Sequence, residues 1–153
     1  MTAGRLNYHN LSLISGEYLY VNNKEHSSVV AEVESEIIVT QRDTQLKHDH
    51  HLINTQDLKW VRDVSFEYEI KTIFYQPDWM TALVKTTSAM ASLPLALTNN
   101  SIVHVLKGEI TNFISHVHSS QKLFIPPNNT EQFFVPIEQS LLYLHMRQKQ
   151  ITE

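Results

Sequence analysis

Two neighbouring stretches decide the fold of this chain: Leu123-Phe-Ile-Pro-Pro-Asn-Asn-Thr-Glu-Gln-Phe-Phe134 and, just before it, Val103-His-Val-Leu-Lys-Gly-Glu-Ile110. In the first, an apolar strand ends at two prolines, Asn128 and Asn129 turn the chain, and a second strand follows. In the second, an apolar strand closes on Gly108. Both patterns predict short strands joined by tight turns.

Elsewhere, apolar residues recur mostly at every second position, which is the spacing of a half-buried strand. The clearest example is Val64-Ser-Phe-Glu-Tyr-Glu-Ile-Lys71, whose apolar and polar side chains fall on opposite faces. The same reasoning predicts further strands at Glu17–Val21, Ser28–Val33, Glu36–Thr40, Thr72–Tyr75, Thr81–Thr86, Ile102–Leu106, Glu109–Ser115, Lys122–Ile125, Gln132–Val135 and Ser140–His145. Many short strands with few helical patterns predict an all-β fold, an antiparallel sandwich or barrel.

The composition is that of an ordinary soluble globular domain. The chain has 153 residues, 42% hydrophobic and 18% charged, a length that suits one domain. The net charge is −4 and the Lys and Arg residues are scattered, so we expect no nucleic-acid partner. The absence of cysteine excludes disulfides, thiolate catalysis and cysteine-ligated zinc.

The one long polar stretch, Arg42–Trp60, is the predicted internal boundary. We expect residues 1–60 to supply N-terminal strands and this connection to the same domain, residues 61–146 to form a barrel, and residues 147–153 to form a tail. The residues Met1–His9 lack a signal-peptide pattern, and no run approaches the roughly 20 apolar residues that span a bilayer. The sequence therefore predicts a cytoplasmic protein with no membrane partner.

The two stretches that decide the fold resemble the sequence motifs of cupin β-barrels. The second cupin motif has the form Gly-five residues-Pro-any-Gly-two residues-His-three residues-Asn. With Pro126 on the motif proline, Ser120 and Asn128 take the two glycine positions. Glu131 then takes the histidine position and Val135 the asparagine position. The resemblance implies a jelly roll, a cupin-like antiparallel barrel with extra N-terminal strands.

The first cupin motif ends in a glycine that closes a strand, and Gly108 matches it. Counting back, the family's metal-ligand glutamate falls near Ser101 and its paired histidines fall near Leu95 and Leu97. The resemblance therefore implies a barrel that has lost most of the family's metal ligands, and we expect no cofactor. The order of elements is also similar to the HutD/Ves-like branch of the cupins, the histidine-utilisation accessory proteins. Because cupins commonly dimerise through extra strands, the resemblance further implies a homodimer.

Four residues are candidates for contacts to a small-molecule ligand: Glu131, Tyr143, His145 and His104. At the motif position, Glu131 is either a polar anchor or general base inside the barrel, or a rim residue that faces water or caps a turn. His104 and His145 lie in apolar strands, either as ligand-binding or catalytic imidazoles inside the barrel or as hydrogen-bonded core or edge residues. Alternation puts Tyr143 on the face of His145, which favours this pair as pocket residues.

Two groups of histidines offer an alternative, a rebuilt metal site. His48-Asp-His50-His51 lies in the polar stretch, and His116-Val-His118 has the i, i+2 spacing that puts two imidazoles on one face of a strand. If the groups meet in space, they could hold a divalent transition metal with Asp49 or Glu131 as an oxygen ligand. Otherwise they are solvated loop or hairpin residues.

These observations leave three functions open, and no catalytic residue is assigned. We expect a non-catalytic, metal-free cupin-like protein that binds a small molecule or a protein partner in a regulatory or accessory role. The alternative is a metal-dependent cupin enzyme, an isomerase, lyase or dioxygenase, whose ligands are Glu131 and the histidines named above. A third is a structural subunit with a solid barrel, because a closed core and an apolar pocket use the same residue types.

Overall fold

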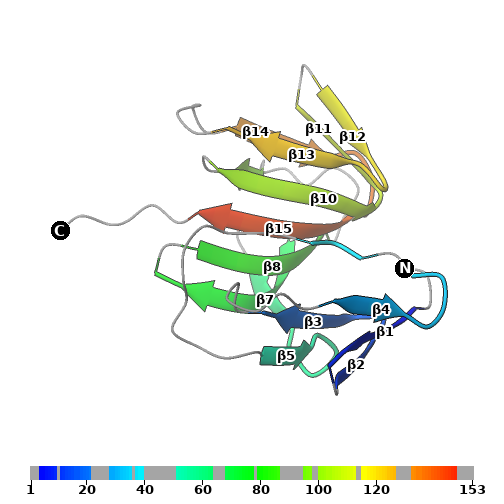
Figure 1. Cartoon of the computed structure of the whole chain (residues 1–153). Coiled ribbons are helices and arrows are strands. Elements are labelled where there is room, and N and C mark those ends of the chain that lie inside the picture. Colours follow the sequence, from blue (N-terminus) through cyan, green and yellow to red (C-terminus); the bar gives the residue numbers. More distant parts are fainter. Residues whose placement is uncertain are drawn as a thin grey trace. The chain divides into compact units, whose positions relative to one another are not determined.

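The computed structural model describes residues 4–9, 11–21, 28–35, 37–39, 51–63, 68–77, 79–86, 95–97, 100–112, 115–126 and 132–147 (Figure 1). These residues form antiparallel β-strands joined by turns, which confirms the predicted all-β fold. None of them belongs to a helix that is long and apolar enough to cross a membrane. The chain divides into two compact units, residues 1–57 and 58–153.

The first unit contains two small antiparallel sheets. Its strands are β1 (Arg5–Tyr8), β2 (Leu11–Ile14), β3 (Glu17–Tyr20), β4 (Val29–Ala31) and β5 (His51–Asn54). One sheet has the order β2-β1-β4, and the other pairs β3 with β5. The predictions at Glu17–Val21 and Ser28–Val33 correspond to β3 and β4, whereas residues 37–39, within the predicted strand Glu36–Thr40, are not in a strand.

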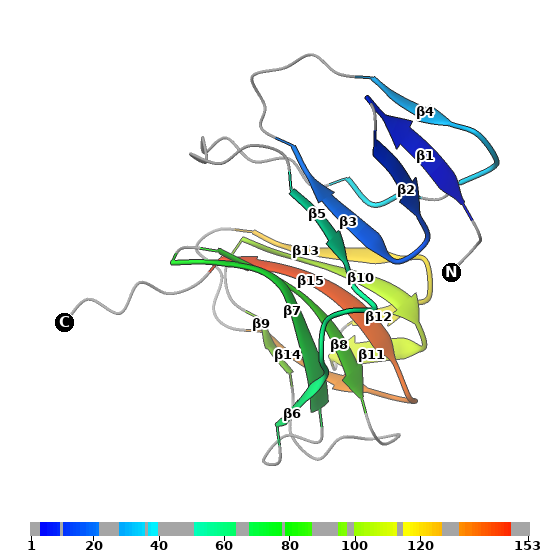
Figure 2. The same ribbon diagram turned by 90° about the horizontal axis from the view of Figure 1, so that it is seen from below.

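The second unit is a two-layered β-structure (Figure 2). Its strands are β6 (Val61–Asp63), β7 (Tyr68–Gln76), β8 (Trp79–Thr86), β9 (Leu95–Leu97), β10 (Ser101–Lys107), β11 (Glu109–Asn112), β12 (Ser115–His118), β13 (Lys122–Ile125), β14 (Gln132–Pro136) and β15 (Leu141–Arg147). A six-stranded sheet has the order β13-β10-β15-β8-β7-β6, and a four-stranded sheet has the order β12-β11-β14-β9.

The core of this unit is made of side chains from both sheets. They are almost all aliphatic or aromatic hydrocarbons and belong to one buried cluster: Tyr68, Val84, Val103, Val105, Ile110, Val117, Ile125, Phe134, Leu142 and Leu144. β10 and β15 each contribute two residues to the cluster, and in both strands these are alternate residues, as a pleated strand requires. The residues between them, such as His104 in β10 and Tyr143 in β15, therefore lie on the opposite face of the six-stranded sheet.

Two predicted strands have different limits in the structure. The predicted strands that meet at Lys71 and Thr72 are one strand, β7, whose pairing with β8 shifts register between Thr72 and Phe74. The predicted strand Glu109–Ser115 ends at Asn112, and Ser115 begins the next strand. There the Asn112 side chain accepts a hydrogen bond from the Ser115 backbone N–H at 2.7 Å. Such local side-chain bonding is typical of turns and competes with a continuing strand.

A buried polar junction joins β8, β11 and the start of β15. Thr86 and Ser140 are both buried, and the Ser140 N–H donates to Thr86 Oγ1 at 2.7 Å. The Ser140 hydroxyl accepts the Glu109 N–H at 3.1 Å and can donate to the Glu138 carbonyl at 2.9 Å. Gly108 has a φ of 86° and passes directly against Ser140. The junction is compact because every one of these polar groups has a partner.

The turn between β12 and β13 contains Ser120, which the resemblance places at the first glycine of the second cupin motif. Ser120, at that glycine position, has a φ of 69°, and the Gln121 N–H donates to the His118 carbonyl at 3.0 Å. A positive φ at the third residue of such a turn favours glycine. Ser120 therefore adopts a backbone conformation that glycine would adopt more easily.

We predict that Ser120→Gly stabilises the protein by about 0.5–1 kcal/mol, because relief of the left-handed conformation exceeds the entropy that glycine adds to the unfolded chain. Urea denaturation of both proteins measures the difference. Ser119→Gly is the matched control: its φ is not positive and its hydroxyl donates to the Leu106 carbonyl at 3.2 Å, so this change should destabilise. A Ser120→Gly variant less stable than the wild type would refute the prediction.

Candidate functional site

Ser101, near which the resemblance places a metal-ligand glutamate, lies on the core face of its strand. Ser101 is fully buried and shares the core face of β10 with Val103 and Val105. The backbone of Leu95 and Leu97 forms β9, which pairs with β14. A serine hydroxyl is a poor ligand and leucine has no donor atom, so these residues do not fit a transition metal of the kind the family holds.

Part of the predicted site falls outside the described residues. Glu131, His48 and His50 are not among them, and of His51 only the backbone, in β5, is described. The meeting of the two histidine groups therefore stays a prediction. Within the described residues, no three His, Asp or Glu side chains are already arranged so that they could hold a metal ion.

The structure brings His104, Tyr143 and His145 together on one face of the six-stranded sheet. His104 pairs with Tyr143 across β10 and β15, and their rings are in edge contact with centroids 5.8 Å apart. Because Leu142 and Leu144 point into the core, these three side chains lie on the opposite face of the sheet. They therefore do not share the face of the core side chains, and their role in ligand binding stays a prediction.

His145 is held from two sides in this arrangement. Its side chain is buried, with 3% of its surface exposed, and its Nδ1 lies 2.9 Å from the hydroxyl of the buried Thr81. The Trp79 ring stacks on the imidazole with centroids 4.7 Å apart. This burial and these contacts are typical of a structural histidine, one of the two interpretations that the sequence left open.

His104 is the more accessible of the two histidines. It is half-buried, and its cross-strand neighbour on β13 is the exposed Lys122. Burial, and then the positive charge of Lys122, hold the pKa of His104 below its ordinary value of 6.5. Phe124, on the same face of β13 and 56% exposed, pairs with Ile102. We call Lys122, Phe124, Ile102 and His104 the β10–β13 strip: it presents a cation, an imidazole and an apolar surface side by side.

We predict that NMR titration of the His104 ring gives a pKa below 6.5 and that Lys122→Gln raises it. Because the folded state holds this pKa below its unfolded value, the unfolded state binds more protons as the pH falls through 6.5. The contribution of His104 to stability is therefore present above that pH and lost below it. A measured pKa at or above 6.5, or no change in Lys122→Gln, would show that burial and Lys122 do not act as described.

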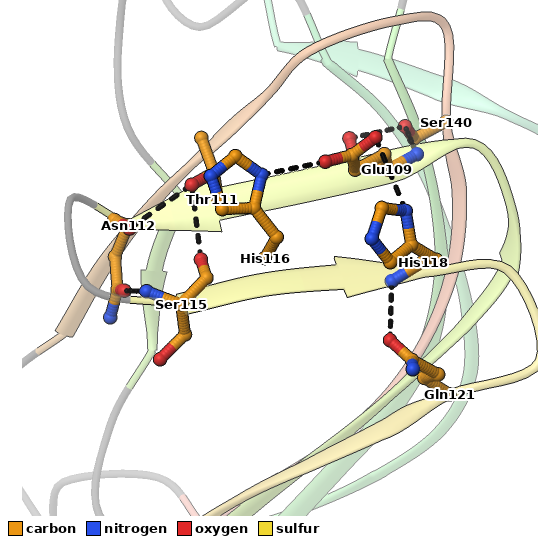
Figure 3. Close-up of polar contacts among 8 residues, drawn as sticks. All are labelled: Glu109, Thr111, Asn112, Ser115, His116, His118, Gln121 and Ser140. Carbon is orange, nitrogen blue, oxygen red and sulfur yellow. Dashed lines mark hydrogen bonds and ion pairs between the residues drawn. The ribbon is translucent and has the colours of Figure 1, made fainter.

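A second polar cluster lies on the β11–β12 hairpin (Figure 3). Glu109 accepts contacts from two histidines: Oε1 lies 2.7 Å from His116 Nδ1, and Oε2 lies 3.3 Å from His118 Nδ1. Sequence reasoning identified both histidines but missed Glu109. The signal that could have found it is the hairpin register, which sets Glu109 directly opposite His118.

Comparisons with family models and with curated proteins found no match. Among solved structures, an RmlC-like cupin from Shewanella frigidimarina has a TM-score of 0.51 at 12% identity, covering 63% of this chain and 88% of that one. A protein named as glyoxylate-induced, from Pseudomonas aeruginosa, has a TM-score of 0.62 at 11% identity; the match covers 95% of this chain and 62% of that one. At these identities the likeness is one of fold.

Proposed function

Because this chain has the cupin fold, as its sequence predicted, we propose that it is a binding protein with a metal-free barrel and a regulatory or accessory role. The observation that carries the proposal is the buried Ser101. It lies near the position where the resemblance places a metal ligand, and it shares the core face of β10 with Val103 and Val105. A barrel that replaces ligating groups with serine and leucine retains the scaffold but not the donors for metal chemistry.

For the binding surface we propose the β10–β13 strip. The partly exposed His104 ring can accept or donate a hydrogen bond in its neutral form, and Lys122 supplies a positive charge beside it. The exposed Phe124 adds apolar contact area. Such a surface suits a small molecule, or a segment of a protein partner, that carries a negatively charged group next to an apolar one.

The first experiment measures metal in protein made without an affinity tag and dialysed against EDTA. We expect metal far below one equivalent by mass spectrometry. Stoichiometric iron, manganese, nickel or zinc that survives EDTA would overturn the proposal and favour the alternative, a metal-dependent isomerase, lyase or dioxygenase.

The second experiment is a thermal-shift screen with small aromatic and aliphatic carboxylates and phosphates. Compounds that raise the melting temperature of the wild type should lose this effect in Lys122→Gln and in His104→Gln. His9→Gln, which replaces a histidine in the first unit, should respond like the wild type and serves as the matched control. Equal shifts in all the variants would exclude the β10–β13 strip as the binding surface.

We also propose that the protein is a homodimer. The first unit exposes large β-branched side chains, among them Val30 at 58% and Val39 at 76%. Burial of such side chains against a second copy of the chain would remove apolar surface from water. Sedimentation velocity at micromolar concentration should give the mass of two chains, and a monomer throughout the accessible concentration range would contradict the proposal.

A further inference from the structure

The outer face of the β11–β12 hairpin gathers the donor types of a metal site. Ile110 and Val117 point into the core, so the alternate residues Glu109, His116 and His118 lie on the other face. Figure 3 shows the Glu109 carboxylate reaching toward both imidazoles. Two imidazoles and one carboxylate are a common ligand set for divalent transition metals.

The carboxylate comes from a well-anchored position. The Glu109 N–H donates to the Ser140 hydroxyl at 3.1 Å, and its carbonyl accepts the Ile137 N–H at 3.0 Å. Its side chain is 21% exposed, whereas the side chains of His116 and His118 are 61% and 58% exposed. The carboxylate is thus comparatively fixed, and the imidazoles can change rotamer without disturbing the core.

The distances describe a hydrogen-bonded form from which metal binding needs only side-chain rotation. Two ligand atoms on one tetrahedral metal, with bonds of about 2.0–2.1 Å, lie roughly 3.3 Å apart. At present His116 Nδ1 lies 2.7 Å from Glu109 Oε1 and His118 Nδ1 lies 3.3 Å from Oε2, so both rings must turn toward the same carboxylate oxygen. The two rings are nearly parallel with centroids 6.5 Å apart, so they must also tilt toward each other.

We propose that Glu109, His116 and His118 bind a divalent transition metal such as Zn²⁺, Ni²⁺ or Cu²⁺ when the two imidazoles rotate to a common point. On binding, the contacts between the imidazoles and the Glu109 carboxylate are replaced by bonds to the metal, one from each ring and one from a carboxylate oxygen. Each ligating nitrogen must be free of its proton, so binding weakens as the pH falls. Three protein ligands leave at least one coordination position for water or an outside donor. This site is separate from the position of the family's metal inside the barrel.

The test titrates untagged, EDTA-treated protein with NiCl₂ and ZnCl₂, followed by calorimetry and by NMR of the histidine ring nitrogens. We expect one equivalent to bind, with shifts at His116 and His118. The variant with His116→Gln and His118→Gln should lose this binding, and Glu109→Gln should weaken it about tenfold or more. The matched control replaces His48, His50 and His51 with glutamine and should bind like the wild type.

The proposal is overturned if the wild type does not bind, if the His116/His118 double variant binds equally well, or if the His48/His50/His51 variant loses the binding. Circular dichroism of each variant verifies that it is folded. These results are distinct from those that test the metal-free barrel. A surface site of three exposed ligands releases its metal to EDTA, whereas a barrel metal that survives EDTA and the His116/His118 substitutions would contradict the proposed function alone.

Discussion

Replacing Ser101 with glutamate is expected to destabilise the protein by about 3–5 kcal/mol, because the new carboxylate would be buried beside the apolar core. Ser101 is fully buried on the core face of β10, where Val103 and Val105 are its neighbours. A charge there would lose its hydration and face mainly hydrocarbon. Urea denaturation monitored by circular dichroism measures the loss. A Ser101→Glu variant as stable as the wild type would contradict the placement of Ser101 in the core.

A matched variant and the pH dependence separate the effect of charge from the effect of size on the stability of Ser101→Glu. Ser101→Gln has the same length without the charge and should lose less, so the difference reports the cost of the charge. The loss in Ser101→Glu should shrink at acidic pH, where the carboxyl becomes neutral.

Adding Leu95→His and Leu97→His to Ser101→Glu restores, with Glu131, the family's ligand types. Ni²⁺ or Zn²⁺ should then raise the melting temperature of the triple variant more than that of Ser101→Glu alone, because the site proposed at Glu109, His116 and His118 is present in both.

Replacing Gly108 with alanine should cost about 3 kcal/mol or more, for two reasons that add. Its φ of 86° is strained for any residue with a Cβ. The added Cβ would also lie 2.8 Å from the Gln139 carbonyl oxygen and from Ser140 Cα, and would collide with Ser140 Oγ. At roughly 2–4 °C for each kcal/mol, the melting temperature should fall by about 6–12 °C. Differential scanning calorimetry measures the change.

Gly108→Asn separates the effect of the positive φ from the effect of the close approach to Ser140. Asparagine tolerates a positive φ better than alanine does but has the same Cβ. We therefore expect Gly108→Asn to be more stable than Gly108→Ala and still clearly less stable than the wild type. If the asparagine variant matched the wild type, the close approach to Ser140 would not limit this position.

The sequence predicted the strands best where alternation and turn residues agree. The predicted strand Lys122–Ile125 has the same bounds as β13, because alternating burial within it is followed by prolines that end the pairing. Of the predicted strand Val64–Lys71, residues 64–67 lie outside the described residues. In the rest, Tyr68 belongs to the buried core and Ile70 packs against it, as the alternation predicted. The strands β1, β2, β5, β6 and β9 were missed. Of these, β6 and β9 have only three residues, which is too few to show alternation.

The candidate site was harder to predict, because alternation alone does not say which face of a strand is the inner one. His145 and Tyr143 do share a face, as the sequence indicated, but Leu142 and Leu144 occupy the inner one. That choice depends on the second sheet, whose Ile110 and Phe134 meet them. Glu109 was missed for a related reason: its proximity to His118 comes from the pairing of two strands.

The position of β15 between β10 and β8 has a consequence for how the chain folds. The last described strand lies in the middle of the six-stranded sheet. Just before it, the Ser140 N–H donates to the hydroxyl of Thr86, 54 positions earlier. Pairings so distant in sequence make folding slow. Until β15 has left the ribosome, β8 and β10 expose unpaired edges to other chains, so expression at lower temperature or with chaperones should raise the yield of soluble protein.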